Sequence, residues 1–252
     1  METAFVLRRA LLALLPATML LASCSKSDTP APTPAVDQGK VAFLNAASHV
    51  APTTLKFLVD NSEKASLAYG ASSGYQSIQT GSHSLQVMAG TQNAFTTTLA
   101  PDKDKTYTFV ATPSASSTTV GGLLFPDDLT APAAGKARIR VINLGQSVST
   151  PVRLSQVTST VTGPVVVDIV ANVGINTASA FTDFTPGTYA LSILDNSTGA
   201  SLNPLAQVGD GSGSGTGTKN YEAGKIYTVV LSGTSGSLNQ DQKLKAFVSQ
   251  NN

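Results

Sequence analysis

A serine stands between two glycines in the stretch GASSG, from Gly70 to Gly74, which fits the G-x-S-x-G spelling of a hydrolase nucleophile elbow. In that elbow a sharp turn between a strand and a helix exposes the serine hydroxyl. The next residues, YQSIQTGSHSLQV, alternate like a strand, and His83 follows too closely for the serine, acid, histidine order of that fold. We therefore expect a turn between two strands and no catalytic residue. A cryptic hydrolase that uses Ser72 is the weakest of three functional alternatives.

The two histidines, His49 and His83, are candidates for a metal site. Two imidazoles without thiolates or a spaced carboxylate make a small ligand set. His83 also falls on the polar side of an alternating segment, so we expect a solvent-facing imidazole rather than a ligand.

Two pairs of aspartates, Asp102 with Asp104 and Asp127 with Asp128, stand near expected strand ends. Neither pair follows the D-x-[DN]-x-[DN]-G spacing of a calcium loop, and acidic residues are common in tight turns. The glycine-serine stretch at 208–220 has no G-K-[ST] ending, so it is not a phosphate-binding loop. We predict no metal and no cofactor, and leave calcium at the acidic turns open.

Cys24 is the only cysteine in the chain and follows Leu21, an alanine and a serine. Two arginines, an apolar run and then small residues precede it, which is the layout of an export signal too short to span a bilayer. The ending resembles the lipobox of bacterial lipoproteins, whose cysteine sulfur takes a diacylglycerol. We predict a signal peptide over 1–23, lipid on Cys24 and a Pro/Ser/Thr-rich tether over 24–39. An incidental cysteine after an ordinary signal peptide is the weaker alternative.

Lipid on Cys24 predicts a location in the bacterial cell envelope, with acyl chains as the membrane anchor. Ser25 replaces the aspartate that marks inner-membrane retention in some bacteria, which favours the outer membrane; the face stays open. The chain has 16 basic and 15 acidic residues, and removing 1–23 takes two arginines and one glutamate, which leaves 14 of each. This balance, without basic runs, argues against a nucleic-acid partner.

Three landmarks occur twice and in the same order after the tether. An apolar strand ends at an asparagine, a glycine precedes an alternating segment, and a polar turn precedes a strand that opens on tyrosine. The paired landmarks are Asn45 and Asn143, Gly81 and Gly187, and Tyr107 and Tyr227. Short alternating runs bounded by glycine or proline are typical of half-buried strands. We predict an all-β protein with one sandwich at 40–129 and a divergent second copy at 136–252.

The first copy resembles the bacterial family known as domain of unknown function 4397 (DUF4397). The resemblance rests on KVAFLNAASHVAP, a strand ending in VD, then YG and SGY, then GSHSLQV and a final YT strand, from Lys40 to about Pro113. The second copy keeps VIN, PGTYALSI and AGKIYTVVL but lacks the VD and YG landmarks. The resemblance implies immunoglobulin-like β-sandwiches on an envelope or secreted protein. The family has no assigned chemistry, so the resemblance implies no catalytic residue.

Tyr107 and Tyr227 each open a strand just after a turn, as does the tyrosine corner of immunoglobulin-type domains. Tyr107 falls on the same face as Phe109, and Tyr227 on the same face as Val229, which predicts buried rings with hydroxyls bonded to backbone. Stacking on a sugar is the weaker reading, because tryptophan is absent and the six tyrosines are scattered.

We therefore expect a non-catalytic envelope lipoprotein that serves adhesion, scaffolding or assembly, not an enzyme. A binding module for a glycan or an envelope protein is the second alternative.

Overall fold

The computed structural model describes residues 36–50, 54–114, 120–148, 151–196, 204–209 and 217–252. The predicted signal peptide and Cys24 lie outside the described residues. Apart from one 3-10 turn, η1 (Ser48–Val50), the described secondary structure consists of strands, which confirms the all-β prediction. In the described ranges no helix has the length and apolar character needed to cross a membrane.

Residues 36–252 form one compact unit, whose sheets make up two β domains. The first β domain, residues 38–126, has two four-stranded sheets with the orders β4-β1-β7-β8 and β3-β2-β5-β6. Its strands are β1 (Gln38–Asn45), β2 (Leu55–Val59), β3 (Ser62–Leu67), β4 (Ser72–Gln79), β5 (His83–Ala89), β6 (Gln92–Leu99), β7 (Thr106–Pro113) and β8 (Val120–Pro126).

The second β domain, residues 137–250, contains sheets with the orders β11-β10-β15-β16 and β12-β9-β18-β19, with β13 also paired to β9 and a small β14-β17 pair. Its strands are β9 (Ala137–Gln146), β10 (Val152–Thr160), β11 (Gly163–Val173), β12 (Thr177–Ala178), β13 (Thr182–Phe184), β14 (Gly187–Tyr189), β15 (Leu191–Asp195), β16 (Ala206–Gln207), β17 (Lys219–Tyr221), β18 (Ile226–Thr234) and β19 (Lys245–Gln250).

Each β domain has a core between its two large sheets. In the first domain three rings meet at centroid distances of 5.3–6.3 Å, those of Phe43, Phe57 and Phe109. All three are buried, as expected for aromatic residues at alternate positions that face one core. In the second domain Tyr227, Val229 and Leu231 belong to the corresponding core, which confirms the predicted shared face of β18.

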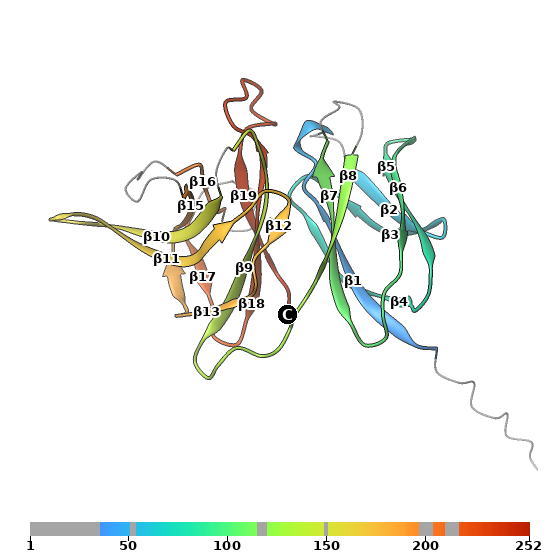
Figure 1. The fold of residues 1–252 in the computed structure, drawn as a ribbon, viewed down its shortest axis with the longest axis horizontal. Helices are drawn as coiled ribbons and strands as arrows, with labels where there is room; N and C mark the ends of the chain where they lie inside the picture. The colour runs from blue at the N-terminus through green and yellow to red at the C-terminus, as the bar shows by residue number, and fades with distance from the viewer. Residues whose placement is uncertain (1–35, 51–53, 115–119, 149–150, 197–203, 210–216) are drawn as a thin grey trace, which may run out of the picture. The chain divides into compact units, whose positions relative to one another are not determined.

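The two β domains repeat one strand arrangement. β1 pairs in parallel with β7, with Val41 opposite Tyr107, and β9 pairs in parallel with β18, with Ile139 opposite Tyr227 (Figure 1). In both domains the residue opposite the landmark tyrosine stands at the same distance along the strand from the landmark asparagine. The sequence repeat therefore includes the register of these strand pairs.

The paired asparagines also play the same part in each domain. Asn45 Nδ2 donates to Leu67 O, and Asn45 Oδ1 accepts from Ala47 N, at 3.0 and 3.1 Å. In the second domain Asn143 makes the corresponding bonds to Val173 O and Gly145 N at the same two distances. Both asparagines are fully buried. Each therefore holds the end of its strand by satisfying backbone groups that would otherwise be buried without partners.

The half-buried pattern expected of the strands is wrong for several of them. Thr108 and Val110 on β7 and Thr228 and Val230 on β18 are buried, although their neighbours along the strand fill the domain cores. Both faces of these strands are therefore covered. The reason is that the outer faces of the β1-β7 and β9-β18 sheets meet in a shared apolar cluster.

Candidate functional site at the interface of the two β domains

An ion pair joins the two β domains inside the compact unit. Arg140 lies on β9, and Asp127 follows the last residue of β8; Arg140 Nη2 is 2.5 Å from Asp127 Oδ1. Only 2% of the Arg140 side chain and none of the Asp127 side chain is exposed. Charges so deeply buried need partners for all their polar atoms, because water cannot supply them.

The partners form a closed ring of polar contacts. Asp127 Oδ2 accepts from the Tyr75 hydroxyl at 2.6 Å, and that hydroxyl accepts from Asn251 Nδ2 at 2.8 Å. Asn251 Oδ1 accepts from the Thr228 hydroxyl at 2.8 Å, whose oxygen accepts from Arg140 Nε at 3.1 Å. The ring crosses the interface at two places, between Tyr75 and Asn251 and between Asp127 and Arg140, so separating the domains would break both contacts together.

Further contacts complete the guanidinium's surroundings. Arg140 Nη1 donates to Pro126 O and Nη2 donates to the Thr108 hydroxyl, both at 3.1 Å. The guanidinium carbon lies 4.6 Å from the centroid of the Phe181 ring, within the range of a cation–π contact. The planar fork of an arginine suits this arrangement, since a lysine ammonium could not reach partners in all these directions.

Burial raises the pKa of the Tyr75 phenol, and the negative charge of Asp127 raises it further. The phenol therefore stays protonated at all physiological pH values. This protonation is what lets the Tyr75 hydroxyl donate to Asp127 while it accepts from Asn251.

Apolar side chains surround the polar ring. The buried members of this interface cluster come from both domains: Leu44, Ala46, Val110, Ile142, Leu144 and Val230. Phe247 packs edge-on against Tyr69, with ring centroids 5.7 Å apart, and the Ser232 hydroxyl donates to Ala46 O at 2.5 Å. The interface therefore has the composition of a protein interior, with apolar packing around the paired polar groups of the ring.

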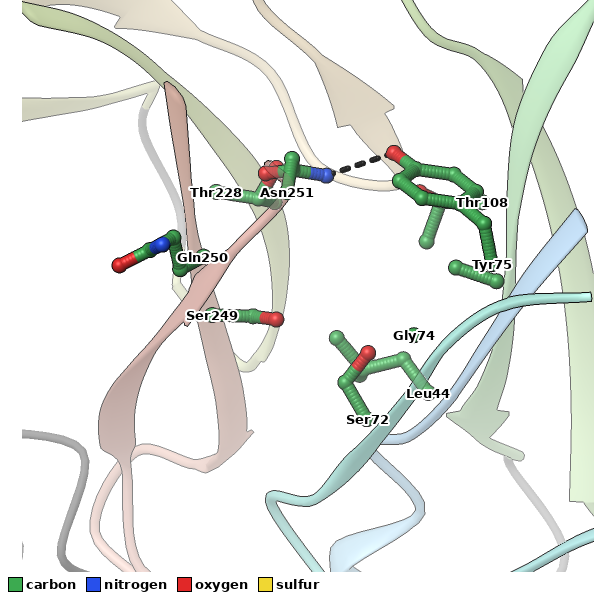
Figure 2. Close-up of a pocket in the computed structure, with 10 residues that line it drawn as sticks. Leu44, Ser72, Gly74, Tyr75, Thr108, Thr228, Ser249, Gln250 and Asn251 are labelled. Atoms are coloured by element: carbon green, nitrogen blue, oxygen red, sulfur yellow. Dashed lines mark hydrogen bonds between the residues drawn. The ribbon is translucent and has the colours of Figure 1, made fainter. Parts of the chain in front are cut away.

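A narrow crevice opens beside the polar ring. Figure 2 shows Asn251 pointing across it toward Tyr75, with Ser72 and Ser249 on its walls. The centre of a water molecule has about 10 Å³ to move in, which is room for about one water. The crevice is too small for an organic substrate.

Ser72 opens β4 and lines this crevice, and neither histidine lines it. The neighbouring Ser73 hydroxyl accepts from Phe43 N at 3.0 Å and donates to Gly74 O at 2.6 Å, while Gly70 and Gly74 both have positive φ. The G-x-S-x-G stretch thus leads through a turn into a strand, with no helix after it. The geometry of a nucleophile elbow is not formed here.

His83 differs from the expected solvent-facing imidazole. Only 15% of its side chain is exposed, because Nδ1 lies 2.6 Å from Asp60 Oδ2 and Nε2 lies 2.9 Å from Gln79 O. The hydrogen bond to Asp60 is the main cause that raises the pKa of His83, and the same bond lowers the pKa of Asp60. The pair ties a turn to a strand, and His49 lies apart from it, half-buried in η1.

The acidic pairs have separate partners. Asp127 forms an ion pair with Arg140. Asp128 accepts hydrogen bonds from the backbone amide and the hydroxyl of Thr130, and it forms an ion pair with Arg138 at 3.2 Å. The Thr130 bonds are the main cause that lowers the pKa of Asp128 to about 2. Within the described ranges no three histidine, cysteine or acidic side chains come together as metal ligands.

The structure places Asp102 and Asp104 in the turn before β7, where Asp104 has a positive φ of 58°. The Tyr107 hydroxyl donates to Asp102 Oδ2 at 2.9 Å, and the Tyr107 ring is only partly buried. This differs from the expected backbone bond. Tyr227 is 1% exposed, and its hydroxyl accepts from Glu222 N at 3.0 Å. Each tyrosine thus ties its strand to the turn before it. Residues 210–216 of the glycine-serine stretch lie outside the described part.

Sequence reasoning missed Arg140, Tyr75 and Asn251 as interface residues. A signal was present: Arg140 alternates with Ile142 and Leu144 on the face of β9 that points away from the domain core. Two large apolar residues on a face expected to be polar indicate a second covered surface. The partners of Arg140 come from distant strands, so no local pattern could name them.

Residues 30–151 match the family described as "Domain of unknown function (DUF4397)". The chain contains a DUF4397 domain. The match is to one copy, so the likeness of the second domain rests on its strand pairing. A search of the curated proteins found no match.

Among solved structures, the chain is similar to a leucine-rich repeat protein from Bacteroides thetaiotaomicron VPI-5482, with 11% sequence identity and a TM-score of 0.20. The alignment covers 79% of this chain and 26% of that protein, so this chain spans about a quarter of its length. At this TM-score the likeness carries no argument.

Two landmarks of the DUF4397 domain have a structural explanation in this chain. The aspartate of the VD landmark is Asp60, which binds His83 and accepts from Ser84 N at 2.9 Å, both in the GSHSLQV landmark. The tyrosine of the SGY landmark is Tyr75, which binds Asp127. Both landmarks thus serve contacts that hold the DUF4397 domain together or join it to the second domain.

Proposed function

We propose that this chain is a non-catalytic lipoprotein of the bacterial cell envelope that serves as an adhesion, scaffold or assembly module. Lipid on Cys24 is the anchor, and the proline-rich tether separates it from β1. The outer membrane is the proposed location, on the argument from Ser25 given above. The sequence around Cys24 supports the anchor, because small residues next to a lone thiol meet the chemical needs of lipidation and processing.

The domain architecture supports a structural role. Each β domain has two packed sheets of mostly antiparallel strands and a length near that of an immunoglobulin-like sandwich. We include an immunoglobulin-like topology for both domains in the proposal. Such sandwiches recur in cell-surface proteins as building blocks, although a fold alone does not determine a function.

The observation that carries the proposal is the closed polar ring at the domain interface. A module that bears load or holds a partner at a fixed place needs domains that do not turn freely against each other. Interfaces between domains of one chain are usually polar and permit motion unless they are large and apolar. Here an ion pair with no exposed carboxylate and an apolar cluster hold the two domains. A crevice with room for about one water gives no support to catalysis there.

The anchor is tested by the Cys24→Ser variant, with Ser27→Ala in the tether as the matched control. We expect the native chain and the control to fractionate with membranes and to show the mass of a processed, acylated protein. Cys24→Ser should leave the membrane fraction or remain as an unprocessed precursor, because the hydroxyl cannot replace the sulfur as acceptor. A Cys24→Ser variant with native mass and membrane fractionation contradicts the lipoprotein assignment.

A glycan- or protein-binding module is the second candidate. The observation that favours it is the half-buried ring of Tyr189, which lines a cleft in the second β domain and packs on the buried Tyr221 ring.

A further inference from the structure

A cleft of about 350 Å³ lies in the second β domain along β11, the edge strand of its sheet. This volume is within the range of sites that bind small ligands. The residues that line the cleft include Gln156, Val167, Asp168, Thr182, Asp183 and Tyr189. They come from β10, β11, β13 and β14, so one continuous stretch of the chain, 156–189, provides them.

Two carboxylates on the strands beside the cleft are held in place and neutralised. Asp168 Oδ2 is 3.2 Å from Arg153 Nη1, and its Oδ1 accepts from the Ser155 hydroxyl at 2.6 Å. Asp183 Oδ1 is 3.4 Å from Arg138 Nε. The carboxylates are nevertheless 39% and 38% exposed, so each keeps lone pairs directed at solvent. In the strand pairs Asp168 lies opposite Ser155 and Asp183 lies opposite Arg138, on the sheet faces that point away from the core. Gln156 and Thr182 lie on the core faces, at the cleft. These uncharged amide and hydroxyl groups favour a neutral ligand that carries hydroxyl groups over a cation.

An aromatic side chain adds an apolar surface to this cleft. Tyr189 is half-buried, its ring stacks on Tyr221 with centroids 6.4 Å apart, and its hydroxyl donates to Pro186 O at 3.2 Å. Tyr221 packs edge-on against Phe184 and Tyr227 at 5.5 and 5.1 Å. Three tyrosines that are scattered in the sequence are therefore clustered in the fold. The cluster holds the Tyr189 ring in one position, which lowers the entropy lost when a ligand binds.

We propose that this cleft binds a neutral saccharide. A sugar ring presents apolar C–H groups on its faces and hydroxyl groups around its rim, which suits an aromatic surface flanked by amide and hydroxyl groups. Tyr189 contacts the sugar face, and Gln156 and Thr182 supply the polar contacts to its hydroxyls. The inference depends neither on the lipid anchor nor on the rigidity of the domain interface.

The test is saturation-transfer NMR and a binding titration on the full chain in detergent. The probes are cellotetraose, maltotetraose and chitotetraose as neutral saccharides, and tetralysine as a cationic peptide. Val167→Glu places a new charge in the cleft at a residue that is 55% exposed. Val161→Glu is the matched control, because Val161 is fully exposed between β10 and β11 and does not line the cleft. Tyr189→Ala removes the aromatic contact.

We expect at least one of the neutral saccharides to bind, and its affinity to fall at least about tenfold in Val167→Glu and in Tyr189→Ala. Val161→Glu should bind like the native chain. Three outcomes would overturn the proposal: no neutral saccharide binds at millimolar concentration, binding is equal in Val167→Glu and Val161→Glu, or only tetralysine binds. Because Val167→Glu changes an exposed residue, its result stays informative if Tyr189→Ala does not fold.

Discussion

Arg138 and Arg140 lie two positions apart on β9 and have different surroundings. Arg140 is buried with Asp127, whereas Arg138 is 14% exposed and its partners, Asp128 and Asp183, are 59% and 38% exposed. Removing one member of a buried pair leaves a charge without a partner, at a cost of about 3–5 kcal/mol. An exposed pair contributes about 0–1 kcal/mol.

We therefore predict that Arg140→Met lowers the free energy of unfolding by about 3–5 kcal/mol, and that Arg138→Met, its matched control, lowers it by about 1 kcal/mol or less. Urea unfolding measures both. Adding Asp127→Leu to Arg140→Met should restore part of the loss, since no charge then stays buried alone. Equal losses in the two single variants would mean that Arg140 is not buried with Asp127.

Tyr107 and Tyr227 also differ in their surroundings. The Tyr227 hydroxyl accepts from a backbone amide in a buried position, while Tyr107 bonds a carboxylate in an exposed turn. Tyr227→Phe should lower the free energy of unfolding by about 1 kcal/mol, because the Glu222 amide loses its acceptor. Tyr107→Phe should cost less, since water can replace the lost bond to Asp102. A larger loss in Tyr107→Phe would contradict the placement of the two rings.

At the scale of elements, the β2–β3 turn is fastened to β5 by the Asp60–His83 pair. Asp60 and Asn61 form this two-residue turn with φ values of 48° and 64°, as a type I′ hairpin requires. The carboxylate of Asp60 then reaches the first residue of β5. The turn therefore adds a titratable contact between two strands of one sheet.

This contact predicts a dependence of stability on pH. The raised pKa of His83 stabilises the fold fully below the ordinary histidine pKa of about 6.5, and the contribution is lost as pH rises through the folded pKa. The lowered pKa of Asp60 adds stability that is lost as pH falls below about 4. The difference in melting temperature between the native chain and His83→Gln should thus be larger at pH 5 than at pH 9. His49→Gln controls for the other histidine, and a difference independent of pH would refute the pair.

Much of the element structure can be predicted from local patterns. Alternation is sufficient for β5, where Leu85 and Val87 are buried and their neighbours are not. Alternation fails for β15. The face predicted to be buried, which includes Leu191, is buried, but Ser192 and Leu194 on the opposite face are buried as well. A local pattern shows which residues can face a core, but not whether another surface covers the opposite face. The same limit hid the polar ring, whose members come from β4, β9 and β18 and from the residues that follow β8 and β19.

At the scale of the whole molecule, residues 36–252 contain two cores and a third apolar cluster between them. The interface polar groups are paired across the domains, so turning one domain would leave buried donors and acceptors without partners. We infer that the domains move and unfold together. The proposed role as a scaffold depends on this coupling, because a freely hinged pair could not hold a partner in a fixed place.

Differential scanning calorimetry of the full chain tests this coupling most directly. We predict a single transition in which the calorimetric and van't Hoff enthalpies agree, as expected when both domains unfold as one unit. Arg140→Met should separate it into two transitions, whereas Arg138→Met should keep one. Two independent transitions in the native chain would contradict the coupled interface and, with it, the proposal of a rigid two-domain module.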